Sequence, residues 1–140
     1  MNFYTDSSEW RYLFKTAMDW DTIIPFYYPS FPTPDGFQSR EELIHFYEEL
    51  LSAAGKWAGE TIAPRARELD QIGAGRLENE GVVISEVLKK TYQEAKEIGV
   101  LGMTAPHRFG GMGVPAGLGR LAFQSLSRAC ISTSAQIGFF

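Results

Sequence analysis

One glycine-rich stretch, residues 97–113, has the composition of a loop that could hold a phosphate. Gly110, Gly111 and Gly113 allow tight turns and the close approach of another backbone or a ligand. The stretch lacks the Gly-Lys-Ser/Thr ending of a P-loop and the G-x-G-x-x-G spacing of a dinucleotide loop, and no buried strand precedes it. We therefore interpret it as a connector between two packed helices.

The other chemically active residues form no recognisable catalytic or metal-binding motif. His45 is expected at the edge of a helix's apolar face, and His107, which follows a proline, is expected to meet a partner or solvent. The single cysteine, Cys130, excludes an internal disulfide and is predicted to be an inert buried thiol. Four carboxylates fit a solvated helix face better than a catalytic pair: Glu41, Glu42, Glu48 and Glu49. We expect neither a catalytic residue nor a metal ligand here.

Charge is distributed unevenly along the chain. The net charge of −4 argues against a nucleic-acid partner. All 17 carboxylates lie within residues 1–100, whereas residues 101–140 contain three arginines and no carboxylate. Such a stretch is either buried or faces a negative group, and its Gly, Ala and Leu content favours burial. No apolar run approaches the roughly 20 residues that span a membrane, and no secretory signal is visible, so a cytoplasmic location is expected.

The spacing of apolar residues predicts an all-α fold, a small helical bundle of about four or five helices. The first helix is predicted over about residues 8–20 behind a serine cap. The second is predicted to run to about residue 63 behind a capping box formed by Ser39 and Glu42. Pro64 should kink or end this second helix, because an interior proline removes a hydrogen bond and crowds the preceding turn.

The C-terminal half continues the helical pattern after a predicted loop at residues 71–84. A third helix should run from a cap at Ser85 to a stop at Gly99, and a fourth should follow Pro115. Residues 132–133 are expected to break the fourth helix and to cap another. Apart from one short β-branched run within the loop, no segment shows the alternation of a strand.

Residues 1–38 are predicted to form an aromatic- and proline-rich N-terminal arm with one helix, and residues 39–140 the helical domain. The second half of the arm should be extended, because four prolines fix φ and remove backbone donors: Pro25, Pro29, Pro32 and Pro34. Its aromatic side chains could line a ligand site, but packing against another domain or a second subunit is favoured: Phe26, Tyr27, Tyr28 and Phe31. We expect the arm to be ordered by contact, not by a fold of its own.

Two motifs resemble the N-terminal domain of acyl-CoA dehydrogenases. In residues 97–113 a Glu-hydrophobic-Gly-hydrophobic-hydrophobic-Gly run is followed by Pro and then by aromatic-Gly-Gly-x-Gly, at the spacing found in that family. Residues 126–133 resemble the family's Leu-Ala-Arg-small-x-x-Ser stretch. The family usually has Glu-Glu ahead of that stretch, where this chain has Gln124 and Ser125. Agreement is weaker over residues 40–84 and absent over the arm.

The resemblance implies a parent enzyme with three domains: an N-terminal helical domain, a small β domain and a C-terminal helical bundle. FAD would lie between the last two domains. The parent would be an FAD-dependent acyl-CoA dehydrogenase that oxidises the Cα–Cβ bond of an acyl-CoA thioester, with a catalytic Glu supplied far downstream. This chain alone should then be inactive and bind no FAD. The resemblance also implies a homo-oligomer, with electron-transfer flavoprotein as a candidate partner.

The resemblance further places Ile137, Gly138 and Phe139 at the closed end of the acyl channel, as substrate-binding residues. Gly138 would leave room there for a long or bulky acyl group, or it merely lets two helices approach closely. A same-fold flavin oxidase, such as an acyl-CoA oxidase or a nitroalkane-oxidase-like protein, is an alternative. A free-standing helical interaction module without a cofactor is another. A β domain encoded beyond Phe140 would favour the enzyme, and a stop codon there would favour the module.

Overall fold

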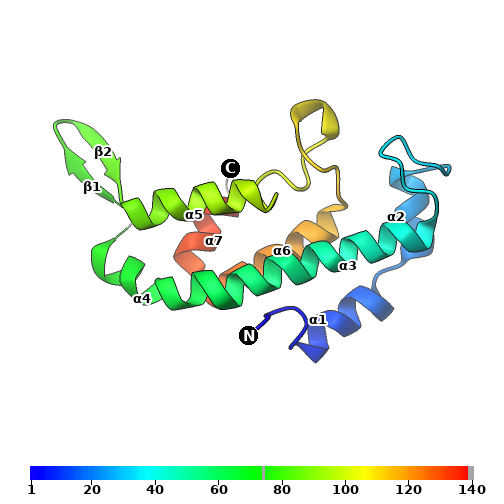
Figure 1. Cartoon of the computed structure of the whole chain (residues 1–140), viewed down its shortest axis with the longest axis horizontal. Coiled ribbons are helices and arrows are strands. Elements are labelled where there is room, and N and C mark those ends of the chain that lie inside the picture. Colours follow the sequence, from blue (N-terminus) through cyan, green and yellow to red (C-terminus); the bar gives the residue numbers. More distant parts are fainter. Residues whose placement is uncertain (74, 139–140) are drawn as a thin grey trace.

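The computed structural model describes residues 1–73 and 75–138 and is built mainly from helices (Figure 1). In chain order the elements are α1 (Ser8–Tyr12), a π-helical segment (Leu13–Ala17), α2 (Trp20–Tyr27), α3 (Arg40–Trp57), a π-helical turn (Ala58–Ile62), α4 (Ala63–Ile72), β1 (Gly75–Glu78), β2 (Gly81–Ile84), α5 (Glu86–Glu97), α6 (Ala116–Ala129) and α7 (Ile131–Gly138). The long helix α3 packs against α6, which packs against α7, while α5 contacts α4 and α7. The predicted helical fold is confirmed. None of the described helices has the length and hydropathy to cross a membrane.

The hydrophobic core follows one face of α3. Four side chains at helical spacing on this face are buried: Leu43, Tyr47, Leu51 and Ala54. One cluster joins this face to side chains of the arm and of α6: Tyr4, Phe14, Trp20, Ile24, Leu118 and Leu121. A second cluster forms around the end of α3 and the end of α7: Phe3, Trp57, Ile62, Ala95, Leu126 and Ile137. Each fully buried large side chain contributes about 1.5–3 kcal/mol.

The arm is more helical than its sequence suggested. The first predicted helix is broken at Met18, where the backbone becomes extended, and a second helix, α2, follows. The prediction of an extended chain from Pro25 onward is therefore wrong, because Pro25 lies inside α2. Asp19 caps this helix, and the burial of Trp20 and Ile24 in the core offsets the one hydrogen bond that the proline removes.

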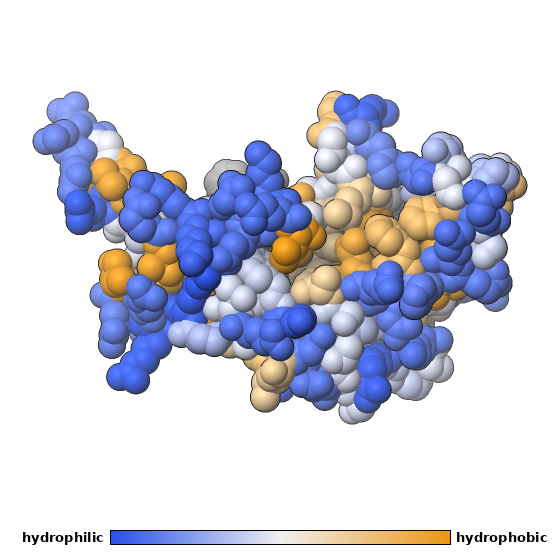
Figure 2. All heavy atoms as spheres, viewed as in Figure 1, coloured by the Kyte–Doolittle hydropathy of each residue, from blue (hydrophilic) through white to orange (hydrophobic). Residues whose placement is uncertain are grey.

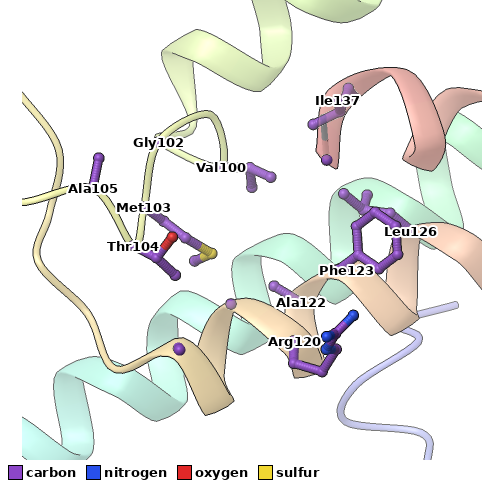
Figure 3. Close-up of a pocket in the computed structure, with 13 residues that line it drawn as sticks. Val100, Gly102, Met103, Thr104, Ala105, Arg120, Ala122, Phe123, Leu126 and Ile137 are labelled. Atoms are coloured by element: carbon purple, nitrogen blue, oxygen red, sulfur yellow. The ribbon is translucent and has the colours of Figure 1, made fainter. Parts of the chain in front are cut away.

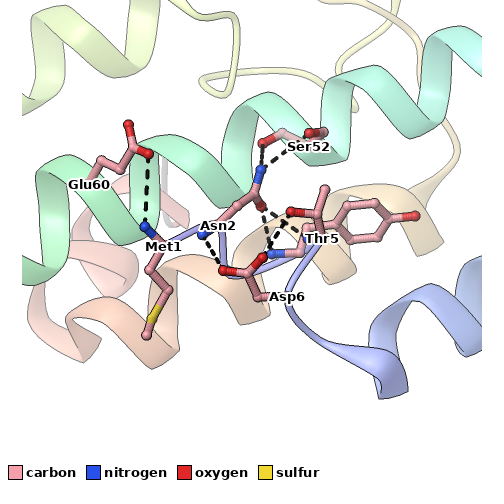
Figure 4. A network of polar contacts seen from close by, with 7 residues as sticks. Met1, Asn2, Thr5, Asp6, Ser52 and Glu60 are labelled. Atoms are coloured by element: carbon pink, nitrogen blue, oxygen red, sulfur yellow. Dashed lines mark hydrogen bonds and ion pairs between the residues drawn. The ribbon is translucent and has the colours of Figure 1, made fainter.

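The first residues of the arm lie directly on α3 (Figure 4). The backbone N–H of Phe3 donates to the carbonyl of Gly55 at 2.9 Å, and the side-chain amide of Asn2 donates to the carbonyl of Ser52 at 3.0 Å. A Cβ on Gly55 would lie 2.5 Å from the backbone nitrogen of Tyr4. Gly55 is thus needed for this close approach, and contacts with the helical domain hold the arm, as expected from the sequence.

The long second helix stays helical past Pro64, with its α-helical pattern interrupted just before it. Residues 58–62 form a π-helical turn, in which the N–H of Ala63 donates to the carbonyl of Ala58. Pro64 then falls in the first turn of α4, where the missing N–H costs least. The α-helical pattern is interrupted by a π turn at residues 58–62, just before Pro64, and the helix then continues through Pro64 to Ile72.

Residues 71–84 contain a β-hairpin, so the prediction of a loop there is wrong. Strands β1 and β2 pair antiparallel. The two-residue connection, Asn79–Glu80, has positive φ angles of 46° and 68°, as in the type I′ turns whose twist suits a hairpin. The β-branched run noted in the sequence supplies β2. Figure 1 shows that the hairpin projects from the helices, and Figure 2 shows hydrophobic surface on it. Leu77 and Val82 are among its exposed apolar residues.

The helices of the C-terminal half begin and end close to the predicted residues, except at the break between α6 and α7. Ser85 caps α5, Gly99 follows its end with a φ of 75°, and Pro115 directly precedes α6. The break between α6 and α7 falls at Cys130 and not at residues 132–133 as predicted. Cys130 takes an extended backbone with a φ of −160°, so the chain turns there before either hydroxyl residue is reached.

One half-buried ion pair joins α4 to α5. Arg65 donates both terminal guanidinium nitrogens to the carboxylate of Glu94, at 2.6 and 2.8 Å, and Trp57 Nε1 donates to the same carboxylate at 3.3 Å. The side chains of Arg65 and Glu94 are 20% and 22% exposed. Hydrogen bonding to Arg65 is the main cause that lowers the pKa of Glu94 below its usual value of 4.5.

Glu94→Ala should lower the free energy of unfolding at pH 7 by about 1–3 kcal/mol, since it leaves Arg65 without its partner. A carboxylate with a lowered folded-state pKa stabilises the protein above its unfolded-state pKa, and the gain is lost as pH falls through the folded-state value. The difference between wild type and variant should therefore shrink below pH 4.5. Urea unfolding of wild type and variant at pH 7 and at acid pH measures this difference. Glu97→Ala, at an exposed site on α5, is the control and should change the free energy of unfolding little. A loss of stability in Glu94→Ala that does not depend on pH would contradict this role of the ion pair.

Candidate functional site

A cavity of about 710 Å³ opens between the chain segment that follows α5, helix α6 and the end of α7 (Figure 3). Its lining is mostly apolar or small: Val100, Gly102, Met103, Thr104, Ala105, Ala116, Gly119, Arg120, Ala122, Phe123, Leu126, Ile137 and Gly138. Cavities that bind small organic ligands have this size and an apolar lining with few polar groups. The chain thus forms a concave site for a largely hydrophobic group.

Helix α6 supplies the longest wall of the cavity. The cavity-facing residues follow the helical period from the first turn onward: Ala116, Gly119, Arg120, Phe123 and Leu126. Leu118 and Leu121 belong to the core cluster shared with α3. The two faces overlap, because Ala122 and Leu126 line the cavity and also belong to the core clusters.

The opposite wall is the segment of residues 100–105, which glycines hold close to α6. Gly99 and Gly102 have φ angles of 75° and 70°, a left-handed backbone that favours glycine. A Cβ on Gly119 would collide with the side chain of Thr104, so Gly119 lets this segment lie against the helix. The width of the cavity thus depends on these glycines.

The glycine-rich turn serves backbone packing, in agreement with its interpretation as a connector. A Cβ on Gly111 would lie 2.5 Å from the carbonyl oxygen of Gly102, and the N–H of Gly113 donates to the carbonyl of Ala105 at 2.9 Å. Gly110, with a φ of 80°, ends a short 3₁₀ turn. The turn therefore packs against residues 102 and 105 of the segment that forms this wall.

The predicted substrate residues lie on the cavity where the structure describes them. Ile137 and Gly138, at the end of α7, belong to its lining, while Phe139 lies outside the described residues. A Cβ on Gly138 would lie 2.7 Å from Cδ2 of Phe123, so Gly138 also allows α7 to approach α6. Both roles given above for Gly138, room for a ligand and helix approach, stay predictions.

Sequence reasoning did not identify the cavity residues on α6 and on the segment before it. The helical spacing of Arg120 and Phe123 indicates that they lie on one face of α6. The spacing does not indicate that this face meets a cavity, because the cavity forms only when residues 100–105 fold back over α6. The absence of carboxylates after residue 100 was the other sign, and the lining contains none.

The histidines and the cysteine lie away from the cavity. His45 is exposed, which corrects the prediction that it borders an apolar face. Nε2 of His107 is 3.1 Å from Oδ2 of Asp35 in the arm, an oxygen that also accepts the Tyr28 hydroxyl at 2.7 Å. Cys130 is half-buried, less than expected, because it lies in the break between two helices. The described residues contain no His, Cys, Asp and Glu cluster able to hold a metal.

The aromatic residues of the arm do not belong to the cavity lining. Tyr28 and Phe31 pack against the core cluster of α3, while Phe26 is 81% exposed and stacks edge-on against Tyr27. Burial and the hydrogen bond to Asp35 raise the pKa of Tyr28, which keeps its hydroxyl protonated as a donor. Tyr28 and Phe31 therefore tie the arm to the domain, and none of the four aromatic residues lines the cavity.

The comparisons with known proteins agree with this arrangement. The family model "Acyl-CoA dehydrogenase, N-terminal domain" matches residues 46–139, more than half of the chain and all of the cavity lining. The chain therefore belongs to the acyl-CoA dehydrogenase family, whose enzymes oxidise acyl-CoA thioesters. The match includes both motifs on which the resemblance was based and excludes the arm.

The chain is also similar to a curated protein from Ruegeria pomeroyi (strain ATCC 700808 / DSM 15171 / DSS-3), a "3-methylmercaptopropionyl-CoA dehydrogenase". The two are 37% identical over 99 residues, which cover 65% of this chain and 17% of the relative. The chain thus spans a small part of that relative's length. The search of solved structures gave no significant match.

Proposed function

We propose that this chain acts as the N-terminal helical domain of an FAD-dependent acyl-CoA dehydrogenase and forms one wall of the acyl-binding pocket. The observation that carries the proposal is the apolar cavity between α6, α7 and residues 100–105, within the family match. The parent enzyme would oxidise the Cα–Cβ bond of an acyl-CoA thioester. By its name, the relative acts on 3-methylmercaptopropionyl-CoA, an acyl-CoA thioester, which supports this substrate class.

The domain's contribution would be binding and the exclusion of water. Transfer of a methylene from water to an apolar surface gains about 0.8 kcal/mol, so a lining of Val100, Met103, Phe123 and Leu126 favours a hydrocarbon chain. Ile137 and Gly138 would close the end of the pocket. Residues 1–38 would form an arm that fastens α3, and residues 39–140 the domain proper. The β and C-terminal helical domains, a homo-oligomeric partner and electron-transfer flavoprotein are proposed as further partners.

The described residues do not fit FAD. The cavity lining offers one charged side chain, Arg120, and the glycine-rich turn is used for backbone packing. A dinucleotide needs backbone donors or a helix N-terminus at a loop of defined spacing to hold its pyrophosphate. We therefore assign FAD binding and the redox chemistry to other domains of the parent enzyme.

Phe123→Ala in the full-length enzyme should widen the pocket and favour longer acyl chains. Each additional methylene that fits should raise kcat/KM about fourfold relative to wild type, the factor that corresponds to about 0.8 kcal/mol. The measurement is kcat/KM over a series of straight-chain acyl-CoA thioesters. Phe26→Ala removes an exposed aromatic ring from α2 and serves as the matched control. An unchanged chain-length profile in folded, flavin-loaded Phe123→Ala enzyme would refute this role for α6.

A further inference from the structure

The hairpin of β1 and β2 exposes apolar side chains that do not belong to the candidate site (Figure 2). Leu77 and Val82 are 76% and 74% exposed, and they lie on the same face because they are paired across the two strands. This face and two residues of α5, Leu88 and Tyr92, line an apolar groove of about 740 Å³. Contiguous exposed apolar surface of this kind marks an interaction site.

Strand β1 also has a free edge. The sheet has two strands, and within residues 1–73 and 75–138 no backbone hydrogen bond joins β1 to a segment other than β2. Glu78 and Gly81 flank the two-residue turn and form a hydrogen-bonded pair, and such pairs alternate with non-hydrogen-bonded ones along an antiparallel ladder. The N–H and C=O of Leu77 therefore point away from β2. An isolated two-stranded hairpin is marginally stable, and an unpaired edge is a template for another strand.

The charges of β1 make this edge complementary to itself. Arg76 and Glu78 flank Leu77 and lie on the opposite face of the strand. When two β1 strands pair antiparallel with Leu77 opposite Leu77, Arg76 of each copy lies opposite Glu78 of the other. Registers shifted by two residues place Arg76 opposite Arg76 or Glu78 opposite Glu78, and like charges directly opposite each other destabilise a sheet. A shift of one residue would bring outward-pointing backbone groups against inward-pointing ones.

We propose that β1 pairs with β1 of a second copy of this chain, antiparallel and centred on Leu77. The two hairpins then form one four-stranded sheet in the order β2-β1-β1-β2. Leu77 and Val82 of both copies form a continuous apolar row on one face, and two Arg76–Glu78 pairs form on the other. Three or more strands with an apolar face are stable where a lone hairpin is not. Strand β2 has no charged residue, so nothing in it selects a register.

This pairing gives the homo-oligomeric partner a surface, and in that respect the inference rests on the proposed function. The pairing itself needs no flavin and no substrate. Four residues on each strand bury less area than the roughly 1,200–2,000 Å² of a stable interface. The contact should therefore be weak in the 140-residue chain, and a covalent bond is the way to capture it.

The test uses the 140-residue chain with Cys130→Ser, which removes its own thiol. Leu77→Cys in this background places two thiols on residues whose Cα atoms lie about 5.5 Å apart, within the range of a disulfide. Val82→Cys is the matched control, because it is similarly exposed on the same face but is separated from its counterpart by three strand spacings, about 14 Å. After mild oxidation, non-reducing electrophoresis should show a dimer yield at least about tenfold higher for Leu77→Cys than for Val82→Cys.

Charge reversal tests the register. Added to Leu77→Cys, Arg76→Glu gives β1 two acidic side chains and Glu78→Arg gives it two basic ones. Each variant alone should lose at least about fivefold in dimer yield, because like charges then face each other in the proposed register. An equimolar mixture of the two variants should restore the yield as a heterodimer. A variant that merely failed to fold could not be rescued by mixing.

Three results would overturn the inference. One is an equal dimer yield from Leu77→Cys and Val82→Cys, and another is a mixture of the charge variants that forms no more dimer than each variant alone. The third is full-length protein in which Leu77→Cys forms no dimer and its thiol is shielded from reagents, since another domain of the same chain would then cover the hairpin. None of these results bears on the proposed function, which instead fails if flavin-loaded full-length protein binds no acyl-CoA.

Discussion

A protein that begins at Ser39 should lose its cooperative unfolding transition and aggregate at room temperature. Deleting residues 1–38 removes four buried side chains of the first core cluster: Tyr4, Phe14, Trp20 and Ile24. At about 1.5–3 kcal/mol each, their burial is comparable to the whole stability of a small domain. The deletion also uncovers the apolar face of α3. Circular dichroism melting and light scattering of the truncated and intact chains measure both effects.

A point variant separates docking of the arm from mere chain shortening. Gly55→Ala should lower the melting temperature, although alanine is favoured over glycine within a helix by about 1 kcal/mol. Its Cβ would press against the backbone nitrogen of Tyr4 and displace the first residues from α3. Ala53→Ser, at an exposed site on the same helix, should change the melting temperature little. A Ser39-start protein with a cooperative transition at the wild-type midpoint would show that the arm does not belong to the core.

Gly138→Glu in the full-length enzyme should shift substrate preference toward shorter acyl chains. A side chain at this site would occupy the end of the proposed pocket and displace the ring of Phe123. Each methylene that no longer fits should cost about 0.8 kcal/mol, or about fourfold in kcat/KM. The measurement is the ratio of kcat/KM for long and short acyl-CoA thioesters.

The same variant distinguishes the two roles predicted for Gly138. If glycine serves helix approach alone, Gly138→Glu should lower stability and leave the chain-length profile of the folded, flavin-loaded enzyme unchanged, which would contradict the pocket assignment. Ser132→Glu places the same charge on an exposed site of α7 and controls for electrostatic effects. The assignment of Gly138 to the pocket is supported only if the chain-length profile changes in Gly138→Glu and stays unchanged in Ser132→Glu.

Local signals in the sequence predicted the domain helices well, because their caps are made by neighbouring residues. Ser39 accepts the N–H of Glu42 at 3.2 Å, and the Glu42 carboxylate accepts the N–H of Gln38 at 2.7 Å, one residue earlier than in a standard capping box. The hairpin was missed because its turn, Asn79–Glu80, lacks the glycine that usually marks a type I′ turn. Helix α2 was missed because tertiary burial of Trp20 outweighs the local effect of a proline.

Some residues of the candidate site were predicted, but from family resemblance and not from local sequence signals. Ile137 and Gly138 came from family resemblance, and no periodicity in the sequence pointed to them. Arg120 and Phe123 lie on a recognisable helix face, but their exposure to a cavity depends on long-range contacts of residues 100–105. A contact such as that between Gly119 and Thr104 joins segments 15 positions apart (119 − 104), and sequence spacing does not reveal it.

We propose above that this chain supplies the N-terminal domain of a flavin enzyme that oxidises acyl-CoA. The most direct test of this proposal is an anaerobic titration of the full-length protein with acyl-CoA, followed by the visible absorbance of the flavin. We expect the full-length protein to purify with stoichiometric FAD, acyl-CoA to bleach the flavin absorbance, and residues 1–140 alone to be colourless. A full-length protein without flavin, a bound flavin that no acyl-CoA reduces, or a yellow 1–140 chain would contradict it.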